Sequence, residues 1–355
     1  MTPFRVGFIG CGRPWKSEGA SGFGMSNAHA DGYNASTEAK IVALADIVEE
    51  NARACQERNG GDEIYTDYHQ MLAKANLDIV SISTWPHLHA PMVLDCARAG
   101  VKAIHCEKPM GVAYGECVEM VRVCNENGVQ LTFNHQRRFG TPFQKARQLL
   151  RAGAIGELQQ MQSYCPNLYD WGTHWFDMLF FYNDETPAEW VIGQFDIRGS
   201  QRVFGALIEG HGLSHIQFAN GVQGMLITGQ GAGKQMVNRL IGSDGMIEVG
   251  YSQEIPLRMW GKGQSGWTTI DTGGEGIHGD ENVKRGVLDL IDALKTGREP
   301  ELAGRRALQS TEVIFASYES SRRRGRVDLP MAITDHPMVA MVSDGLIVEG
   351  DPLCL

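Results

Sequence analysis

The sequence predicts an α/β fold of two domains: a parallel sheet covered by helices, followed by an α/β domain with a large, mainly antiparallel open sheet. Three observations support this. The chain has 355 residues, enough for two domains. About the first 130 residues alternate short apolar runs with helical patterns. After Phe139, strand-like runs follow one another, with the turn dipeptides Asn220-Gly221 and Asp244-Gly245 between some of them.

The N-terminal half has the pattern of alternating strands and helices. Strands are predicted at Phe4–Ile9, Lys40–Ala45, Ile79–Ser83, Lys102–His105 and Gln130–Phe133. Helices are predicted at Met25–Asn34, Val48–Asn59, Tyr68–Lys74, His89–Ala99 and Tyr114–Asn127. Strands that are apolar throughout are typical of a parallel sheet buried on both faces. We therefore expect a first domain at residues 1–133.

The C-terminal half is predicted to be mainly antiparallel. Helices are expected at Pro142–Arg151, His174–Tyr182, Glu281–Thr296 and Gly304–Arg323. Strands are expected at Trp190–Ile197, Gly205–Ile208, Leu213–Phe218, Val222–Thr228, Gln235–Ile241, Met246–Val249 and Leu257–Trp260. We expect a second domain at 134–330, with helices on one sheet face and a homodimer or homotetramer contact on the other. A loop-like C-terminal extension is expected at 331–355.

Composition narrows the class of partner and the compartment. The net charge of −10 disfavours nucleic acid and anionic membranes as partners. No run approaches the roughly 18 apolar residues of a membrane span, and the N-terminus lacks the pattern of a signal peptide. The eight cysteines form no CxxC pair, which favours reduced thiols and a cytoplasmic location.

A glycine-rich turn follows the first predicted strand directly. Gly10 allows a tight turn, and Gly12 lets the backbone approach a pyrophosphate. A helix that begins after such a turn presents free N–H groups and its positive dipole end to the anion. Trp15 stands where a third glycine or alanine is expected. The turn therefore predicts a dinucleotide site of the Rossmann type with an altered third position.

Asp46 indicates where the missing glycine lies. An acid that binds the adenosine ribose is expected about 20 residues after the glycine motif. Asp46 comes 34 residues after Gly12 but 22 after Gly24. We therefore interpret Arg13–Phe23 as an insert and expect the helix to begin near Gly24. The insert either reaches the phosphates and roofs the site, through Arg13 above all, or is a solvated surface loop.

The same carboxylate predicts the choice of cofactor. A negative charge at Asp46 would repel a 2′-phosphate, so NAD is favoured over NADP. The alternative is that Asp46 only caps the next helix.

Three further segments carry polar side chains suited to chemistry. Thr84-Trp85-Pro86-His87-Leu88-His89 and Glu107-Lys108-Pro109 each follow a predicted strand. Both lie at carboxyl ends of parallel strands, where open α/β sheets bind ligands. Asp170 and His174 are spaced i, i+4, which places them on one side of a helical turn.

Taken in order, these motifs resemble the glucose–fructose oxidoreductase / inositol dehydrogenase family (Gfo/Idh/MocA). The glycine turn, the acid after the second strand, the T-x-P-x-x-H segment, E-K-P and D-x-x-x-H span roughly residues 4–325. The resemblance implies a Rossmann domain followed by a substrate domain with a large open sheet. It also implies NAD-dependent oxidation of a carbohydrate hydroxyl.

The resemblance implies a role for each matched position. Lys108 would hydrogen-bond the reacting hydroxyl, and His174 would accept its proton. Asp170 would orient the substrate and tune His174. Glu107 would lie beside the cofactor ribose, and Pro109 would fix the backbone at Lys108. Without the resemblance, a surface lysine and a structural helix histidine would be the plainer interpretations.

We therefore expect two groups of binding residues. The cofactor residues are expected to be Gly10, Gly12, Arg13, Gly24, Asp46, Thr84, Trp85, His89 and Glu107. The substrate residues are expected to be Lys108, Asn134, Gln136, Arg137, Asp170 and His174. Either Arg137 or Arg138 is expected to be a structural salt-bridge residue, and the sequence does not say which. No metal site is expected, because His87 and His89 lack a third ligand at a typical spacing.

Three functions remain open on the sequence. The first is an NAD-dependent dehydrogenase that oxidises a secondary hydroxyl of a sugar, sugar acid or polyol, with His174 as base and Lys108 assisting. The second is a redox-neutral glycosidase or lyase that oxidises the sugar transiently at C3 while retaining NAD. The insert beside the glycine turn motivates this alternative. The third is a sugar-sensing or NAD-binding regulator, which an intact set of Lys108, Asp170 and His174 disfavours.

Overall fold

The computed structural model describes residues 2–13, 24–229, 231–232 and 237–348. The chain forms two compact units, which are described separately. The first consists of Met1–Val112, Glu116–Gln136 and Asp280–Leu308, and the second of Ala113–Gly115, Arg137–Gly279 and Gln309–Leu355.

The first unit is built on a six-stranded sheet in which every neighbouring pair is parallel. The strands are β1 (Phe4–Ile9), β2 (Ala39–Ala45), β3 (Glu63–Tyr65), β4 (Ile79–Ile82), β5 (Ala103–Cys106) and β6 (Gln130–Phe133). Their order is β3-β2-β1-β4-β5-β6, so the order reverses between β1 and β4. This reversal is the topological switch point at which doubly wound sheets bind dinucleotides.

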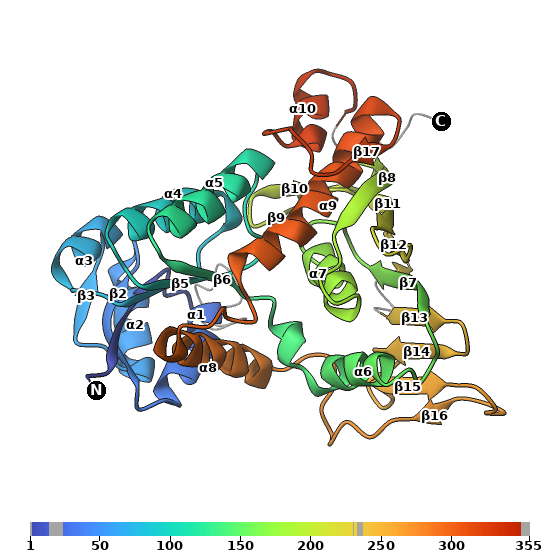
Figure 1. The fold of residues 1–355 in the computed structure, drawn as a ribbon. Helices are drawn as coiled ribbons and strands as arrows, with labels where there is room; N and C mark the ends of the chain where they lie inside the picture. The colour runs from blue at the N-terminus through green and yellow to red at the C-terminus, as the bar shows by residue number, and fades with distance from the viewer. Residues whose placement is uncertain (1, 14–23, 230, 233–236, 349–355) are drawn as a thin grey trace. The chain divides into compact units, whose positions relative to one another are not determined.

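Helices cover both faces of this sheet (Figure 1). They are α1 (Met25–Asn34), α2 (Glu49–Asn59), α3 (Tyr68–Lys74), α4 (Pro86–Arg98), α5 (Tyr114–Glu126) and α8 (Asp280–Thr296). One core cluster includes apolar side chains of α3, α4 and α5, and another those of α1, α2 and α8. A Cβ on Gly32 of α1 would lie 2.6 Å from the Cβ of Val287, so only glycine permits this close approach to α8.

The second unit contains a nine-stranded sheet in the order β16-β15-β14-β13-β7-β12-β11-β8-β17. Its strands are β7 (Leu158–Cys165), β8 (Ala188–Asp196), β11 (His211–Phe218), β12 (Gln223–Thr228), β13 (Asn238–Gly242), β14 (Met246–Val249), β15 (Leu257–Trp260), β16 (Thr268–Thr269) and β17 (Val327–Asp328). The β7–β12 pair is parallel, and the other neighbouring pairs are antiparallel. The predicted two-domain α/β fold with a large, mainly antiparallel second sheet is confirmed.

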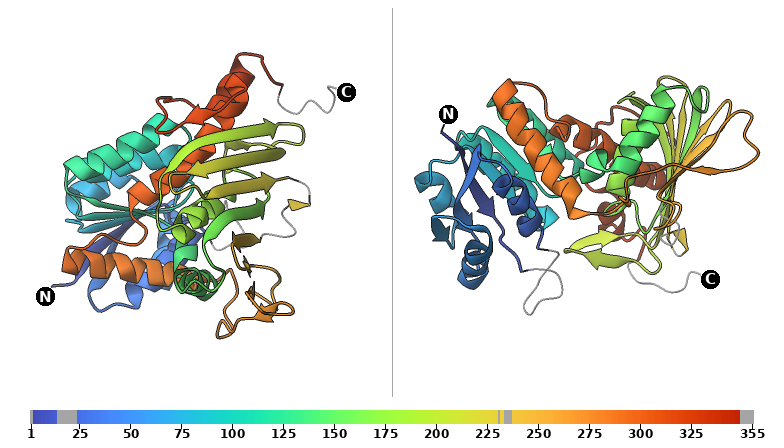
Figure 2. Two further views of the ribbon diagram at one scale, coloured as in Figure 1. Left: turned by 45° about the vertical axis from the view of Figure 1, so that its right-hand side comes forward. Right: turned by 90° about the horizontal axis from the view of Figure 1, so that it is seen from below.

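Helices pack on one face of the large sheet, as the views in Figure 2 show. The helical elements of this part are η1 (Gln136–Phe139), α6 (Thr141–Arg151), α7 (Gly172–Tyr182), α9 (Gly304–Arg323) and α10 (Pro337–Ser343). Ser317 of α9 bonds Ser214 of β11, and α7 packs against β7 and β12. Successive side chains of a strand point to opposite faces of the sheet. In β8, Val191 is fully buried, whereas the next side chain, Ile192, is on the opposite face and is 46% exposed.

The structure corrects several predicted elements. The central strand β7 was not predicted, nor were the short strands β3, β16 and β17. The predicted strand Gly205–Ile208 is β10 (Ala206–Ile208), which pairs with β9 (Gln201–Val203) outside the large sheet. The region after Val327 is not only loop, because it contains β17 and α10. Helix α4 begins at Pro86 rather than His89, since proline suits the first turn of a helix.

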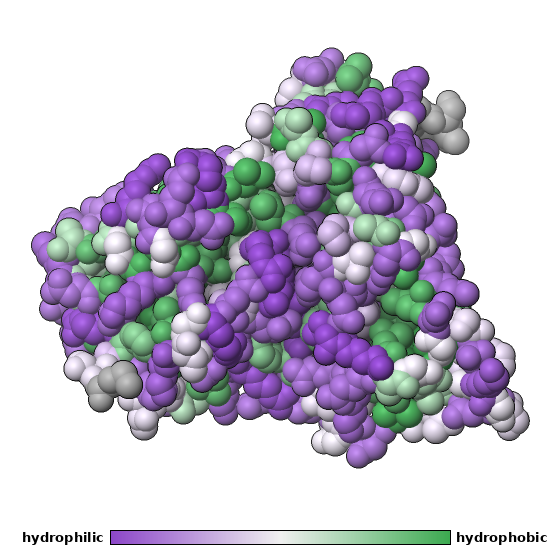
Figure 3. All heavy atoms as spheres, viewed as in Figure 1, coloured by the Kyte–Doolittle hydropathy of each residue, from purple (hydrophilic) through white to green (hydrophobic). Residues whose placement is uncertain are grey.

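The surface drawn in Figure 3 is mainly hydrophilic, with smaller hydrophobic areas among the polar residues. Among the described helices, none combines the length and apolar character that crossing a membrane requires.

Candidate active site

The glycine turn lies directly after β1 and is the tight turn that the sequence predicts. Gly10 has a φ of 85°, and a Cβ there would lie 2.8 Å from Thr84 Cγ2 and 2.9 Å from the carbonyl oxygen of Ser83. Gly12 has a φ of 39°, and its ideal Cβ position is 3.5 Å from the Cα of Gly24. The two glycines that flank the interpreted insert therefore lie close together at this turn.

The start of α1 has the features of an anion site. Gly24 precedes the helix in the left-handed region, with φ 63° and ψ 41°, and no side chain caps it. The first turn contains no acidic residue. A helix N-terminus with uncapped N–H groups and a positive dipole end attracts phosphate. The turn and the helix start thus fit the pyrophosphate of a dinucleotide.

Asp46 lies beside the glycine turn, immediately after β2. Its Oδ2 accepts hydrogen bonds from the amides of Cys11 at 2.9 Å and Gly12 at 3.3 Å, and its Oδ1 accepts one from Val48 at 2.9 Å. The carboxylate therefore orders the turn as well as the start of the next helical segment. Each carboxylate oxygen has more than one acceptor site, so these bonds leave capacity for a ribose hydroxyl.

Arg13 is the first residue of the interpreted insert, and the structure describes no further residue of it. Its Nε donates to Asn51 Oδ1 at 2.9 Å, which directs the side chain to α2. Residues 14–23 of the predicted insert, Trp15 included, lie outside the described residues.

The turn after β4 is held to the turn after β5 by His89. The ring nitrogens of His89 lie 2.9 Å from the carbonyl oxygen of Pro109 and 3.1 Å from that of Thr84. Both partners are carbonyls in a fully buried setting, and burial lowers the pKa of His89. These contacts favour a structural role for His89 over the direct cofactor contact expected from the sequence. Trp85 caps α4 and is 41% exposed, which leaves its ring surface accessible.

Glu107 and Lys108 form the turn after β5, and a buried network supports them. Oε1 of Glu107 lies 2.9 Å from Nε2 of His29 and 2.7 Å from Nδ2 of Asn134, while Oε2 accepts the Lys108 amide at 3.1 Å. Nδ1 of His29 lies 2.7 Å from Ser81 Oγ. Because a carboxylate only accepts, Nε2 of His29 donates to Glu107.

The electrostatics of this network hold Glu107 ionised. Burial alone would raise the pKa of Glu107, but the hydrogen bonds and charge of His29, together with Asn134, outweigh burial and lower it to about 2. The oxygens of Glu107 are engaged within the protein, which favours positioning the Lys108 backbone over direct contact with a ribose. Asn134 keeps one unpartnered buried atom, Oδ1, among the described residues.

Backbone hydrogen bonds align these turns along one edge of the first sheet. Ser83 donates to Ile9, Glu107 to Ile82 and Asn134 to Cys106, each at 2.9 Å. The ladder therefore continues one step past each strand. The predicted residues Gly10, Gly12, Gly24, Asp46, Thr84, Glu107, Lys108 and Asn134 thus belong to the carboxyl edge of this sheet and the adjoining α1 start.

In the second unit, Asp170 and His174 lie at the start of α7. Asn167 Oδ1 accepts the amides of Asp170 at 2.6 Å and Trp171 at 3.1 Å, and the Asn167 carbonyl accepts that of Gly172 at 2.8 Å. Asn167 thus anchors the turn before the helix. Asp170 is 8% exposed and His174 is 4% exposed, so both are buried polar residues.

The two adjacent arginines have different environments. Arg138 forms a buried pair with Asp177, with Nε–Oδ2 and Nη2–Oδ1 distances of 2.8 Å, and its Nη1 lies 2.5 Å from Glu185 Oε1. Arg137 is equally buried, but the described residues give it no carboxylate within ion-pair distance. The structural salt-bridge arginine is therefore Arg138. Gln136, also expected to bind substrate, is half-buried with Oε1 unpartnered among the described residues.

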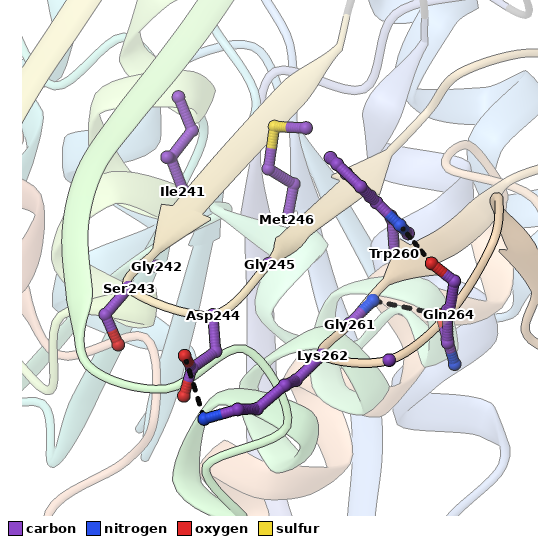
Figure 4. Close-up of a pocket in the computed structure, with 11 residues that line it drawn as sticks. Ile241, Gly242, Ser243, Asp244, Gly245, Met246, Trp260, Gly261, Lys262 and Gln264 are labelled. Atoms are coloured by element: carbon purple, nitrogen blue, oxygen red, sulfur yellow. Dashed lines mark hydrogen bonds and ion pairs between the residues drawn. The ribbon is translucent and has the colours of Figure 1, made fainter.

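A separate hollow lies between the β13–β14 turn and the end of β15 (Figure 4). Asp244 and Lys262 form an exposed ion pair of 3.5 Å at its rim, and Trp260 Nε1 donates to Gln264. None of the predicted site residues lines it. Among the described residues, no group of three or more His, Cys, Asp or Glu side chains is arranged to hold a metal ion.

Comparison with known proteins defines the class. Residues 4–135 match the family model GFO_IDH_MocA, described as an oxidoreductase family with an NAD-binding Rossmann fold. The protein is thus an oxidoreductase with an NAD-binding Rossmann domain. Its residues 4–135 are a domain of the Gfo/Idh/MocA family.

Individual relatives extend this likeness beyond the first domain. The chain is 25% identical to a D-apiose dehydrogenase of Paraburkholderia graminis, over 97% of this chain and 94% of that protein. It is 28% identical to a myo-inositol 2-dehydrogenase of Thermotoga maritima, over 43% of this chain and 42% of that protein. A levoglucosan dehydrogenase solved with NADH and L-sorbose has the same fold, with a TM-score of 0.79, 21% identity, and coverage of 94% of this chain and 100% of that one.

Sequence reasoning missed the residues that support the site from a distance. His29 of α1 contacts Glu107, and Ser81 of β4 contacts His29, but no local motif marks either residue. Asn167 carried a usable signal, because an asparagine side chain often accepts backbone amides in the turn that precedes a helix.

Proposed function

We propose that the protein is an NAD-dependent dehydrogenase that oxidises a secondary hydroxyl of a sugar, sugar acid or polyol. The observation that carries the proposal is the likeness to a D-apiose dehydrogenase over nearly the whole length of both chains. The family motifs E-K-P and D-x-x-x-H are both present, at Glu107–Pro109 and Asp170–His174.

In the proposed reaction, Lys108 donates a hydrogen bond to the substrate hydroxyl, and His174 accepts its proton. Asp170, one turn before His174, orients the hydroxyl groups and the imidazole. NAD, when bound, supplies the acceptor for the hydride. The Glu107 bond to the Lys108 amide supports this assignment, because it fixes the backbone from which the lysine extends.

We also propose that NAD is used in preference to NADP. The Asp46 carboxylate lies at the end of β2, where an acid binds ribose hydroxyls and repels a 2′-phosphate. Replacing Asp46 with Asn removes the charge and keeps an acceptor oxygen. The ratio of kcat/KM for NADP to that for NAD should then rise by about 10-fold, because the variant no longer repels the 2′-phosphate of NADP. An unchanged ratio would leave Asp46 with only the structural role it has at the glycine turn.

The proposal includes a homodimer or homotetramer formed through the open face of the nine-stranded sheet. Ile192 and Leu213 are 46% and 37% exposed on neighbouring strands of that face. Exposed aliphatic side chains on a sheet face favour a protein contact. Light scattering should give a mass of two or four chains, and Ile192→Lys should lower it. The seven described cysteines are free and buried, which supports the proposed cytoplasmic location.

Turnover assays test the function directly. The enzyme is incubated with NAD and a panel of sugars, sugar acids, polyols and glycosides, while absorbance at 340 nm and sugar release are followed. The dehydrogenase predicts NADH in proportion to substrate oxidised. Sugar release that needs NAD but gives no net NADH would instead indicate the redox-neutral glycosidase or lyase.

Two variants distinguish a catalytic role from that of a sugar-sensing or NAD-binding regulator. Lys108→Ala and His174→Ala should abolish turnover and leave NAD affinity within about threefold of wild type, since neither is assigned to cofactor binding. Turnover that survives both changes would overturn the catalytic assignment. NAD binding with no turnover on any substrate would favour the sensing role.

A further inference from the structure

Arg137 is a buried cation to which the described residues bring no carboxylate within ion-pair distance. It is 3% exposed, in η1. Its guanidinium lies 4.4 Å from the ring centre of Trp175 and 5.8 Å from that of Trp171, and Nη2 is 3.5 Å from Nδ1 of His278. Burial lowers the pKa of Arg137 to about 10, which still leaves it positively charged at neutral pH.

Two of its three nitrogens have no hydrogen-bond partner among the described residues, namely Nε and Nη1. Burying a cation without a carboxylate and without full hydrogen bonding is costly, and proteins rarely retain such a group without use. The hydroxyl of Tyr182, 3% exposed in α7, is a second buried group without a partner there. Its pKa is raised by burial and lowered in part by the charge of Arg137, so the two groups share one environment.

The guanidinium lies against the part of α7 that carries the proposed substrate residues. Trp171 directly follows Asp170, and Trp175 directly follows His174. The charge of Asp170 contributes to the electrostatic field at Arg137, and the described residues place no carboxylate in direct contact with it. An anion bound to Nε and Nη1 would therefore lie within the second unit, near the first turn of α7 that carries Trp171 and Trp175.

We propose that Arg137 binds a carboxylate of the substrate, so that the protein acts on a hydroxy acid of the sugar type rather than on a neutral sugar. This inference rests on the proposed dehydrogenase function and narrows its substrate class. A carboxylate carries one negative charge, which matches one arginine. A phosphate carries nearly two, and the nearby Asp170 charge would oppose the second.

The test compares acids with their neutral and phosphorylated counterparts. Gluconate, galactonate, glucuronate and galacturonate are assayed beside glucitol, galactitol, glucose, galactose and glucose 6-phosphate, in the wild type and in Arg137→Met and Arg137→Lys. Arg151→Met is the control, because Arg151 belongs to the same unit and is an exposed partner of Asp184. The wild type should prefer a sugar acid. Arg137→Met should lower kcat/KM for that acid by about 10- to 100-fold, as expected for losing charge-assisted hydrogen bonds, and should lower kcat/KM for neutral substrates by a clearly smaller factor.

Arg137→Lys, which keeps the charge, tests whether the planar geometry of the guanidinium matters for binding the acid. Arg137→Lys should retain part of the preference, since it supplies a cation without the planar fork. Arg151→Met should behave as wild type. An equal loss on acids and neutral sugars, or a wild-type preference for neutral or phosphorylated sugars, would overturn the inference.

Binding gives a readout that does not depend on turnover. Calorimetry with the same acids in the presence of NAD should detect binding to the wild type and an affinity about 10- to 100-fold weaker for Arg137→Met. Acids that bind both proteins equally contradict the inference. Acids that bind both proteins equally, while the panel still reduces NAD, leave the dehydrogenase intact and refute only the carboxylate site, whereas NAD reduction by no member of the panel counts against the dehydrogenase itself.

Discussion

Nε2 of His29 lies 2.9 Å from Oε1 of Glu107, and this bond joins the first helix to the turn that carries Lys108. Both side chains are buried, and the relation spans 78 positions of sequence. The dinucleotide helix and the lysine turn are thereby coupled inside one domain. Removing either partner should therefore lower the stability of the domain in addition to changing local packing.

Replacing His29 with Leu should lower the free energy of unfolding by about 3 kcal/mol, because it leaves a buried carboxylate without its main partner. Urea denaturation at pH 7 measures this. The double variant His29→Leu, Glu107→Gln should recover at least half of the loss, since no charge remains to be buried. A single-variant cost below about 1 kcal/mol would contradict the importance of the pair.

The same carboxylate sets part of the pH dependence of stability. The pKa of Glu107 is lowered to about 2 in the fold, below its ordinary value of 4.5. Its contribution is therefore present above about pH 4.5 and is lost as pH falls towards 2, by an amount on the order of 3 kcal/mol. Glu107→Gln should flatten the change in urea midpoint between pH 5 and pH 3. An identical slope in wild type and variant would mean that other groups dominate.

The two neighbouring arginines should differ in their effect on stability. Arg138→Met breaks a buried network with Asp177 and Glu185 and should cost about 3 kcal/mol or more. Arg137→Met removes a cation that has no carboxylate partner and should change the free energy of unfolding by no more than about 1 kcal/mol. Thermal and urea unfolding of the two variants compare them directly, and equal losses would argue against the distinction.

Gly10 and Gly60 form a matched pair for the glycine turn, because both have a φ of 85°. A Cβ at Gly60 meets nothing within 4 Å, whereas one at Gly10 meets Thr84 and the backbone of Ser83. Gly60→Ala should cost about 1 kcal/mol and leave NAD affinity unchanged. Gly10→Ala should cost more and weaken NAD binding by about 10-fold or more, because the turn must shift. Fluorescence titration with NADH checks this, and equal affinities would remove Gly10 from the cofactor site.

Much of the fold could be predicted because periodicity and turn residues are local signals. The apolar strands of the first sheet and the antiparallel character of the second followed from them. Strand β7 escaped because its sequence, LQQMQSYC, places glutamines on the outer face and only Met161, Ser163 and Cys165 in fully buried positions. The packing of α8 on the first unit could not follow from order along the chain, since it depends on the contact of Gly32 with Val287.

Site residues could be predicted where a local motif marks them, but not where contacts between residues distant in sequence determine their role. Motifs mark Lys108, Asp170 and His174 as candidates, and the spacing to Asp46 predicted the position of Gly24 at the start of α1. The sequence could not distinguish Arg137 from Arg138, because the difference lies in which arginine reaches Asp177. Nor could it reveal His29, whose role depends on the approach of α1 to the end of β5.

The most direct test of the proposed dehydrogenase follows the hydrogen that leaves the sugar. A substrate identified in the panel is deuterated at the oxidised carbon, and the nicotinamide product is analysed by mass spectrometry. Hydride transfer to NAD predicts one deuterium in each NADH formed, in step with the oxidised sugar. A sugar product that retains the deuterium while no net NADH accumulates would contradict the account.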